Sequence, residues 1–161
     1  MKASSIYSAI MVSVFLVTSA FAQTASAKEA SNMPAAKKNK MVVSKAVARS
    51  KVVIQVSDND PKKWNLALNN AKNVQQDYGK ENVDVEIVAY GPGLPMIKLD
   101  SEAGVRVAEA IKDGVKIVAC ENTMRNTKLT KDDMLPNLEY VKSGVPYLMD
   151  KQQEGYSYIR P

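Results

Sequence analysis

The residue best suited to chemistry in this 161-residue chain is its single cysteine, Cys120. It ends the apolar run VKIVA and is followed by Glu121, Asn122 and Thr123, a pattern typical of a buried strand that passes into a helix. Unpaired amides at a helix N-terminus favour a thiolate, which can attack or carry sulfur. Glu121 opposes this effect, because an adjacent carboxylate disfavours a second negative charge. Cys120 is therefore a candidate nucleophile, and the alternative is a small packing residue.

The absence of histidine and of a second cysteine limits the reactions and metal sites that the chain can support. The chain has no histidine, which excludes histidine-based catalytic triads, most zinc and copper sites and the commonest general base. A single cysteine excludes intramolecular disulfides, CxxC redox pairs and cysteine-only metal sites. We therefore expect neither a metal nor a cofactor. The acidic pairs Asp58/Asp60 and Asp132/Asp133 are interpreted as helix caps, since no histidine is available as an acid–base partner.

The segment Gly91, Pro92, Gly93 is the one stretch that could be taken for a phosphate cradle. It matches neither GxGxxG nor GxxxxGK[ST], and its proline lacks an amide that a phosphate would need. We interpret it as a rigid turn in which Gly91 and Gly93 let the backbone pass close to the Cys120 loop. Nucleotide binding is therefore not expected.

Strand-like and helix-like segments alternate from Lys51 onwards. Strands are predicted at residues 51–56, 83–90, 115–119, 138–141 and 156–160. Helices are predicted at residues 61–78, from Asp100 or Ser101 to the Gly114 stop, and at residues 143–154, with a short irregular helix after Cys120. Apolar spacing predicts the inward faces as Trp64, Ala67, Leu68, Ala71, Val74 and Tyr78 in the first helix, Val105, Ala108 and Ile111 in the second, and Val145, Leu148 and Met149 in the last.

This alternation predicts an α/β fold, a three-layer α/β/α sandwich around a mostly parallel five-stranded sheet. Asp60 and Gly79 are expected to cap the first helix, and Thr130 and Asp133 have the spacing of a capping box. The order of the strands cannot be read from the sequence. Right-handed crossovers place the loops after the first four strands at one edge. That edge should gather Asp58, Asn59, Tyr90, Gly91, Gly93, Cys120, Asn122, Thr123 and Ser143.

The first 27 residues have the plan of a secretory signal peptide. A lysine at position 2 precedes an apolar stretch from Ile6 to Phe21, and small-x-small sites predict cleavage after Ala22 or Ala27. We expect an exported protein, periplasmic in a Gram-negative cell, with no stable membrane insertion after cleavage.

The net charge of +5 is unevenly distributed. Residues 28–50 carry six basic side chains and one acidic, whereas residues 51–161 carry 15 basic and 16 acidic, a net charge of −1. We interpret residues 28–50 as a basic flexible linker and residues 51–161 as the α/β domain. A near-neutral domain lacks the one-sided positive field that phosphate backbones require, so no nucleic-acid partner is expected.

Four segments resemble the DsrE/DsrF-like family, particularly its small exported members. They are KVVIQVSDNDPKKWNLALNNAKN at 51–73, VEIVAYGPGL at 85–94, VKIVACENTM at 115–124 and KQQEGYSYIRP at 151–161. The resemblance implies a five-stranded α/β sheet and assembly into homotrimers or homohexamers. It also implies that Cys120, which matches the family's reactive cysteine, carries sulfur as a persulfide between donor and acceptor proteins. Sulfur-relay members have small residues and an Arg-Gly after that cysteine, where this chain has ENTMRN at 121–126.

Two hypotheses follow. In the first, an exported sulfur-handling protein carries a persulfide on Cys120, and Asn122, Thr123 and the helix amides stabilise its anion. In the second, the protein is a non-catalytic binding or oligomeric assembly module in which Cys120 is a packing residue. Exposure of the Cys120 sulfur to solvent separates the two hypotheses.

Overall fold

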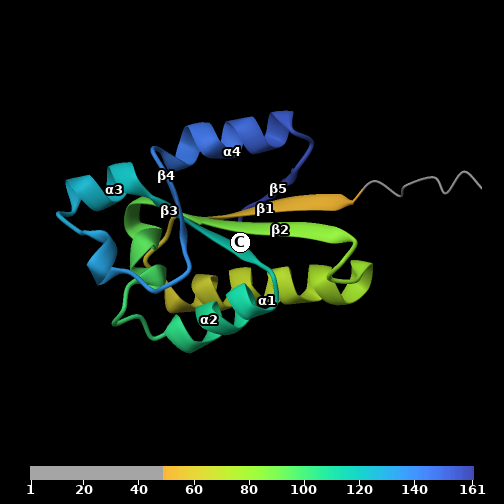
Figure 1. Ribbon diagram of the computed structural model, residues 1–161, viewed down its shortest axis with the longest axis horizontal. Coiled ribbons are helices and arrows are strands. Elements are labelled where there is room, and N and C mark those ends of the chain that lie inside the picture. Colours follow the sequence, from red (N-terminus) through yellow and green to blue (C-terminus); the bar gives the residue numbers. More distant parts are fainter. Residues whose placement is uncertain (1–48) are drawn as a thin grey trace, which may run out of the picture. The chain divides into compact units, whose positions relative to one another are not determined.

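The computed structural model describes residues 49–161, and the predicted signal peptide and nearly all of the predicted linker lie outside them. Five strands form one sheet in the order β4-β3-β2-β1-β5, in which every neighbouring pair is parallel. Helices cover both faces (Figure 1), which confirms the predicted sandwich. The strands are β1 (Ser50–Val56), β2 (Val83–Ala89), β3 (Lys116–Cys120), β4 (Glu139–Val141) and β5 (Ser157–Ile159). The helices are α1 (Pro61–Tyr78), α2 (Gly104–Lys112), α3 (Glu121–Asn126) and α4 (Gly144–Gln153), with 3-10 helices η1 (Gly91–Ile97) and η2 (Lys131–Asp133).

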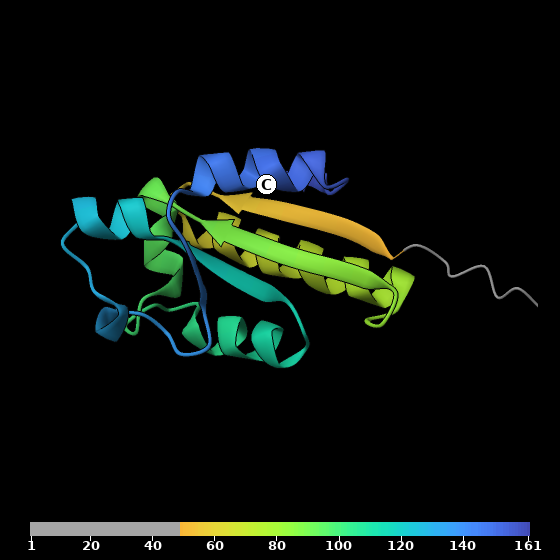
Figure 2. The same ribbon diagram turned by 45° about the horizontal axis from the view of Figure 1, so that its top comes forward.

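One face of the sheet carries the main apolar core. Side chains from alternate positions of β1, β2 and β3 pack there against α1, α2 and η1, and the helices α1 and α2 lie side by side beneath the strands (Figure 2). Ile54, Ile87 and Ile117 from the three central strands are essentially inaccessible to solvent. Because both faces of the sheet are covered, β1, β3 and the second half of β2 contain continuous apolar runs, VVI, IVA and IVA.

The opposite face is covered by α4 and is smaller and more polar. Its apolar centre consists of Val53, Val88, Val118 and Leu148. Cys120 shares this face, because it follows Val118 by two residues along β3 and side chains two apart point the same way. The cysteine therefore lies under the helix layer of α4 rather than in the main core.

Local signals placed the two ends of α1 and the start of η2 correctly. The Asp60 carboxylate accepts a hydrogen bond of 2.8 Å from the Lys62 amide, and Pro61 occupies the first helical position. Gly79 closes α1 with a φ of +84°, which a side chain would strain. Thr130 and Asp133 form the predicted capping box around η2.

Several inward faces were predicted wrongly. Tyr78, Val105, Ala108, Val145 and Met149 are exposed. In α2 the buried position is Val107, and in α4 it is Leu148 with Gly144. The predicted start of the second helix was also early, since α2 begins at Gly104. In these two short helices an apolar residue lies on each side, so spacing alone does not fix which side packs.

The Gly91, Pro92, Gly93 segment is not an isolated turn. It opens η1, a seven-residue 3-10 helix that runs to Ile97 and buries Leu94, Met96 and Ile97 in the main core. Pro92 and Pro95 are tolerated in this 3-10 segment, because the fixed φ of proline is compatible with it. The segment is also short, so it depends on few backbone N–H donors. The segment therefore anchors the loop after β2.

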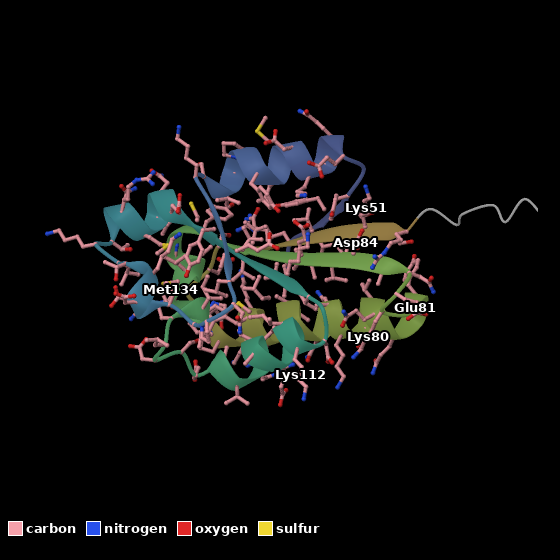
Figure 3. All side chains as sticks on the ribbon, viewed as in Figure 1. Lys51, Lys80, Glu81, Asp84, Lys112 and Met134 are labelled. Carbon is pink, nitrogen blue, oxygen red and sulfur yellow. The ribbon has the colours of Figure 1, made fainter. Side chains whose placement is uncertain are left out.

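The two edges of the sheet differ in character. Charged side chains, including Lys51, Lys80, Glu81 and Asp84, gather at the amino edge (Figure 3). There, Arg49 pairs with Asp84 at 3.0 Å. The carboxyl edge carries Cys120 and the loops that meet around it. Within residues 49–161, no helix combines the length and apolarity needed to cross a membrane.

Candidate functional site

Cys120 lies where two helices begin. It is the last residue of β3 and the N-cap of α3, and its register partner in β4 is Val141. The backbone N–H of Gly144, the first residue of α4, donates a hydrogen bond to the Cys120 Sγ at 3.2 Å. The short loop between β4 and α4 therefore brings a second helix N-terminus to the sulfur. Both termini present amides that stabilise negative charge.

Thr123 connects the sulfur to the loop after β2. The Gly91 N–H donates to Thr123 Oγ1 at 2.9 Å. The Thr123 hydroxyl also lowers the pKa of the Cys120 thiol. Gly91, Cys120 and Thr123, three of the predicted site residues, therefore act in one place, and a hydrogen bond joins Gly91 to Thr123.

The pKa of the Cys120 thiol is set by two opposing effects. Burial raises the pKa, because it disfavours the charged form. The Thr123 hydroxyl and the backbone amides of Thr123, Gly144 and Asn122 lower it, and together they bring the pKa below its ordinary value. The thiolate is therefore favoured by groups from both helices.

The Cys120 side chain is buried, with only 3% of the residue exposed. Such low exposure is expected of a packing residue. The hydrogen-bond donors around the sulfur are instead what a thiolate requires. Glu121, which was expected to disfavour that thiolate, has a cation nearby, since the Lys131 Nζ lies 3.9 Å from its carboxylate. The two charges partly compensate each other at the surface.

Gly144 is a site residue that sequence reasoning missed. A Cβ at this position would lie 3.0 Å from the Tyr90 Cβ, closer than side chains normally pack. Glycine therefore allows the first turn of α4 to lie against Tyr90 and within reach of the sulfur. The available signal was a glycine directly after Ser143, at the start of a helix, where an uncapped amide can bind an anion.

Two cavities flank the cysteine loop. One, of about 520 Å³, lies between α3, β4 and α4 and is lined by Asn122 and Ser143 among others. The other, of about 620 Å³, lies beside η1 and is lined by Asn59, Gly91 and Thr123 among others. The predicted binding residues Asn122 and Thr123 therefore face different cavities.

The remaining predicted residues lie elsewhere on the edge. Asp58 is not a helix cap, since its carboxylate lies 3.2 Å from the Lys63 Nζ and 3.8 Å from the Arg160 guanidinium, next to β5. Gly93 packs on β1, where an added Cβ would overlap the Val56 carbonyl. Of the residues described, no three histidine, cysteine or acidic side chains are grouped to hold a metal ion.

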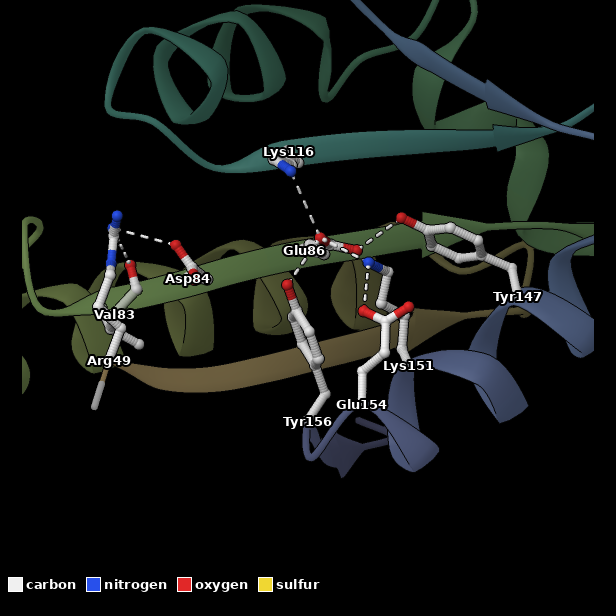
Figure 4. A network of polar contacts seen from close by, with 9 residues as sticks. All are labelled: Arg49, Val83, Asp84, Glu86, Lys116, Tyr147, Lys151, Glu154 and Tyr156. Carbon is white, nitrogen blue, oxygen red and sulfur yellow. Dashed lines mark hydrogen bonds and ion pairs between the residues drawn. The ribbon is translucent and has the colours of Figure 1, made fainter.

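A buried carboxylate lies beneath α4 on the cysteine's face of the sheet (Figure 4). Glu86 of β2 is fully buried and accepts hydrogen bonds from Tyr147 at 2.8 Å and from Tyr156 at 3.1 Å. Lys151 and Lys116 approach its Oε1 to 3.5 and 3.7 Å. Sequence reasoning gave Glu86 no role, and its partners are too distant along the chain for spacing to reveal them.

Comparison with known proteins gives one family and solved structures of similar fold. The sequence model of the DsrE/DsrF-like family matches residues 11–161. A search of curated proteins finds no significant match. A solved structure of a protein of unknown function from Methanobacterium thermoautotrophicum has 36% sequence identity and a TM-score of 0.66. The match covers 70% of this chain and 99% of that one.

A second solved structure, a conserved protein of unknown function from Bacteroides thetaiotaomicron, shares the fold. It has 15% identity and a TM-score of 0.54, covering 70% of this chain and 95% of that one. This likeness concerns the fold alone.

Proposed function

Because the chain belongs to the DsrE/DsrF-like family, we propose that it handles sulfane sulfur in an exported compartment, as a persulfide on Cys120. The observation that carries the proposal is the group of donors around the sulfur. The Gly144 amide donates to Sγ, and the Thr123 hydroxyl and the amides of Asn122 and Thr123 favour the anion. A cysteine that only fills space needs no such donors.

The transfer is a displacement at sulfur. The Cys120 thiolate attacks the outer sulfur of a donor persulfide, a new sulfur–sulfur bond forms, and the donor's own bond breaks. The donor leaves as a thiolate that keeps the electron pair, so no oxidant or reductant is required. Cys120 then carries the persulfide, and an acceptor thiolate removes its outer sulfur by the same reaction. Since Cys120 is 3% exposed, the residues covering it must move during both steps.

Mass spectrometry after exposure to a sulfane-sulfur donor tests this function. We expect the wild-type protein to gain one sulfur on Cys120 and the Cys120→Ser variant to gain none. Equal labelling of the two proteins, or no labelling of the wild type, contradicts the proposal. Serine keeps the size and polarity of the side chain, so the comparison isolates the sulfur.

The second candidate is a non-catalytic binding or assembly module. The burial of Cys120 is the observation that favours it. In that case Cys120→Ala leaves function unchanged, and a thiol probe reacts with the wild type only after unfolding. Reaction of the folded protein with the probe, at a rate far above that of global unfolding, excludes this module.

The proposed setting is the periplasm of a Gram-negative cell, with the signal peptide removed on export after Ala22 or Ala27. Intact-mass measurement of the protein purified from such cells should show loss of the first 22 or 27 residues. A mass that retains Met1 to Phe21 contradicts export by cleavage. The proposed partners are further copies of the chain, as a trimer or hexamer, and a protein that donates or accepts sulfur.

A further inference from the structure

The cavity between α3, β4 and α4 contacts the cysteine's own surroundings. It is lined by Asn122, which follows Cys120 by two residues and donates its backbone N–H to the Lys142 carbonyl, by Val141, the register partner of Cys120, and by Ser143, the neighbour of Gly144. A molecule in this groove would therefore contact residues that are next to Cys120 and Gly144 in the sheet or along the chain. Its volume of about 520 Å³ falls within the range of small-molecule sites.

The groove also carries charges of both signs. Arg125 and Lys142 contribute cations, and Asp150 contributes a carboxylate. None of the three forms an ion pair with another residue in the described part of the chain. The Arg125 guanidinium donates one hydrogen bond, to the Asn122 Oδ1 at 3.3 Å, and its other donors have no protein acceptor in that part. These charges are thus available to a ligand.

The arrangement suits one class of ligand. Two cations fit two carboxylates, Asp150 fits an ammonium group, and Pro146 and Tyr147 offer an apolar surface to a short carbon chain. An inorganic anion such as thiosulfate would leave Asp150 without a partner and most of the groove unfilled. A peptide-like thiol with carboxylates and an ammonium group uses every lining charge.

We infer that the groove binds the carrier part of a small organic persulfide that bears carboxylate and ammonium groups, of the kind formed by glutathione. The inference rests on the proposed function, for which it names the donor class. The donor's outer sulfur passes to the Cys120 thiolate as the carrier's sulfur–sulfur bond breaks. The carrier thiolate then leaves the groove with the electron pair.

Sulfur loading of Cys120, followed by mass spectrometry, tests the inference with two donors. Glutathione persulfide carries the charges, and the persulfide of 2-mercaptoethanol does not. The double variant Arg125→Gln/Lys142→Gln should load from glutathione persulfide about fivefold more slowly, because two exposed charge pairs are lost. Its loading from the uncharged donor should not change. Equal slowing with both donors, or with neither, overturns the inference.

A matched control removes the same charge elsewhere. Lys72→Gln/Lys112→Gln changes two exposed lysines of α1 and α2, on the other face of the sheet. We expect loading from both donors at the wild-type rate. If this control slows glutathione persulfide as much as the groove variant does, the effect is long-range attraction and the groove is not the site.

A binding measurement separates this inference from the proposed function. S-methylglutathione has the carrier's charges but no transferable sulfur, and calorimetry can follow its binding to Cys120→Ser. Binding that is weakened by Arg125→Gln/Lys142→Gln supports the groove even if the wild type never forms a persulfide, an outcome that contradicts only the proposed function. Persulfide formation without such binding leaves the function standing and overturns the groove.

Discussion

The Cys120 sulfur is held by groups from segments that lie far apart in the sequence. Thr123 follows it by three residues in α3, whereas Gly144 reaches it from α4. The sequence placed the cysteine at a helix start and named Thr123, because both signals are local. It could not show Gly144, whose contact depends on β4 being the neighbour of β3.

Removing the Thr123 hydroxyl tests how much this group stabilises the Cys120 thiolate. Thr123→Val should raise the pKa of Cys120 and slow alkylation by iodoacetamide at neutral pH about tenfold, because a hydrogen bond to a charged group is lost. Thr123→Ser should retain the wild-type rate. Thr127→Val is the control, since its hydroxyl bonds backbone carbonyls of α3 instead. An unchanged rate in Thr123→Val would show that the amides suffice.

The lowered pKa also predicts a pH dependence of stability. The unfolded thiol has its ordinary, higher pKa, so the thiolate stabilises the folded state fully above that value, and this contribution is lost as the pH falls through the folded pKa. The difference in free energy of unfolding between wild type and Cys120→Ser should therefore grow as the pH rises from about 6 to about 10. Urea denaturation at several pH values measures it. A difference that shrinks with pH contradicts a lowered pKa.

Among the secondary-structure elements, the strands were predictable and the helix faces only partly so. A strand that is buried on both faces has a continuous run of apolar residues, as in β1 and β3, and this run predicts the strand. The helix α4 is different, because its inner side includes Tyr147 and Lys151, whose partner is the Glu86 carboxylate. Apolar spacing therefore chose Val145 and Met149, which face solvent.

The position of α4 over the sulfur depends on Gly144. Gly144→Ala should destabilise the fold and raise the pKa of Cys120, because the new Cβ meets Tyr90 and displaces the amide from Sγ. Gly104→Ala is a matched control at the first residue of α2, where an added Cβ meets Leu135 at an ordinary 3.6 Å. It should stabilise the protein by about 0.5 to 1 kcal/mol. Thermal unfolding and iodoacetamide rates of both variants give the comparison.

The Glu86 hydrogen bonds should hold α4 and β5 to the sheet. Burial, followed by the Glu86 carboxylate, raises the pKa of Tyr156 to about 12. Tyr147→Phe and Tyr156→Phe each remove one bond to a buried charge and should lower the free energy of unfolding by about 1.5 to 3 kcal/mol. Tyr78→Phe is the control, because 56% of the Tyr78 residue is exposed. Urea denaturation measures the free energy of unfolding of all three variants. An equal decrease in the three would exclude a special role for Glu86.

The fold class of the whole domain follows from its sequence, but its assembly does not. Alternating strands and helices predict a parallel sheet with two helix layers, and this was confirmed. The place of β5 next to β1 was not predictable, since nothing in YSYIR distinguishes one sheet edge from the other. Exposed apolar side chains such as Val145 and Met149 on α4 are compatible with the proposed homo-oligomer.

Sedimentation velocity tests that oligomer. The mature chain should sediment with three or six times the mass of one copy at micromolar concentration, since association would cover the exposed apolar side chains. Dilution should shift the equilibrium towards the single chain. A single-chain mass at every concentration contradicts the proposed assembly and leaves the Cys120 chemistry untouched.

The pairing of β1 with β5 affects how the domain can fold during its synthesis. The first strand of the domain is central, and one of its two neighbours is made from residues 157–159, at the far end of the domain. The sheet cannot be completed before these residues have been synthesised, and Tyr156, a partner of Glu86, arrives equally late. Closing so long a loop makes folding slow. The domain therefore stays open until its last strand has been made, and an open chain is the form of a polypeptide that can pass through a narrow channel.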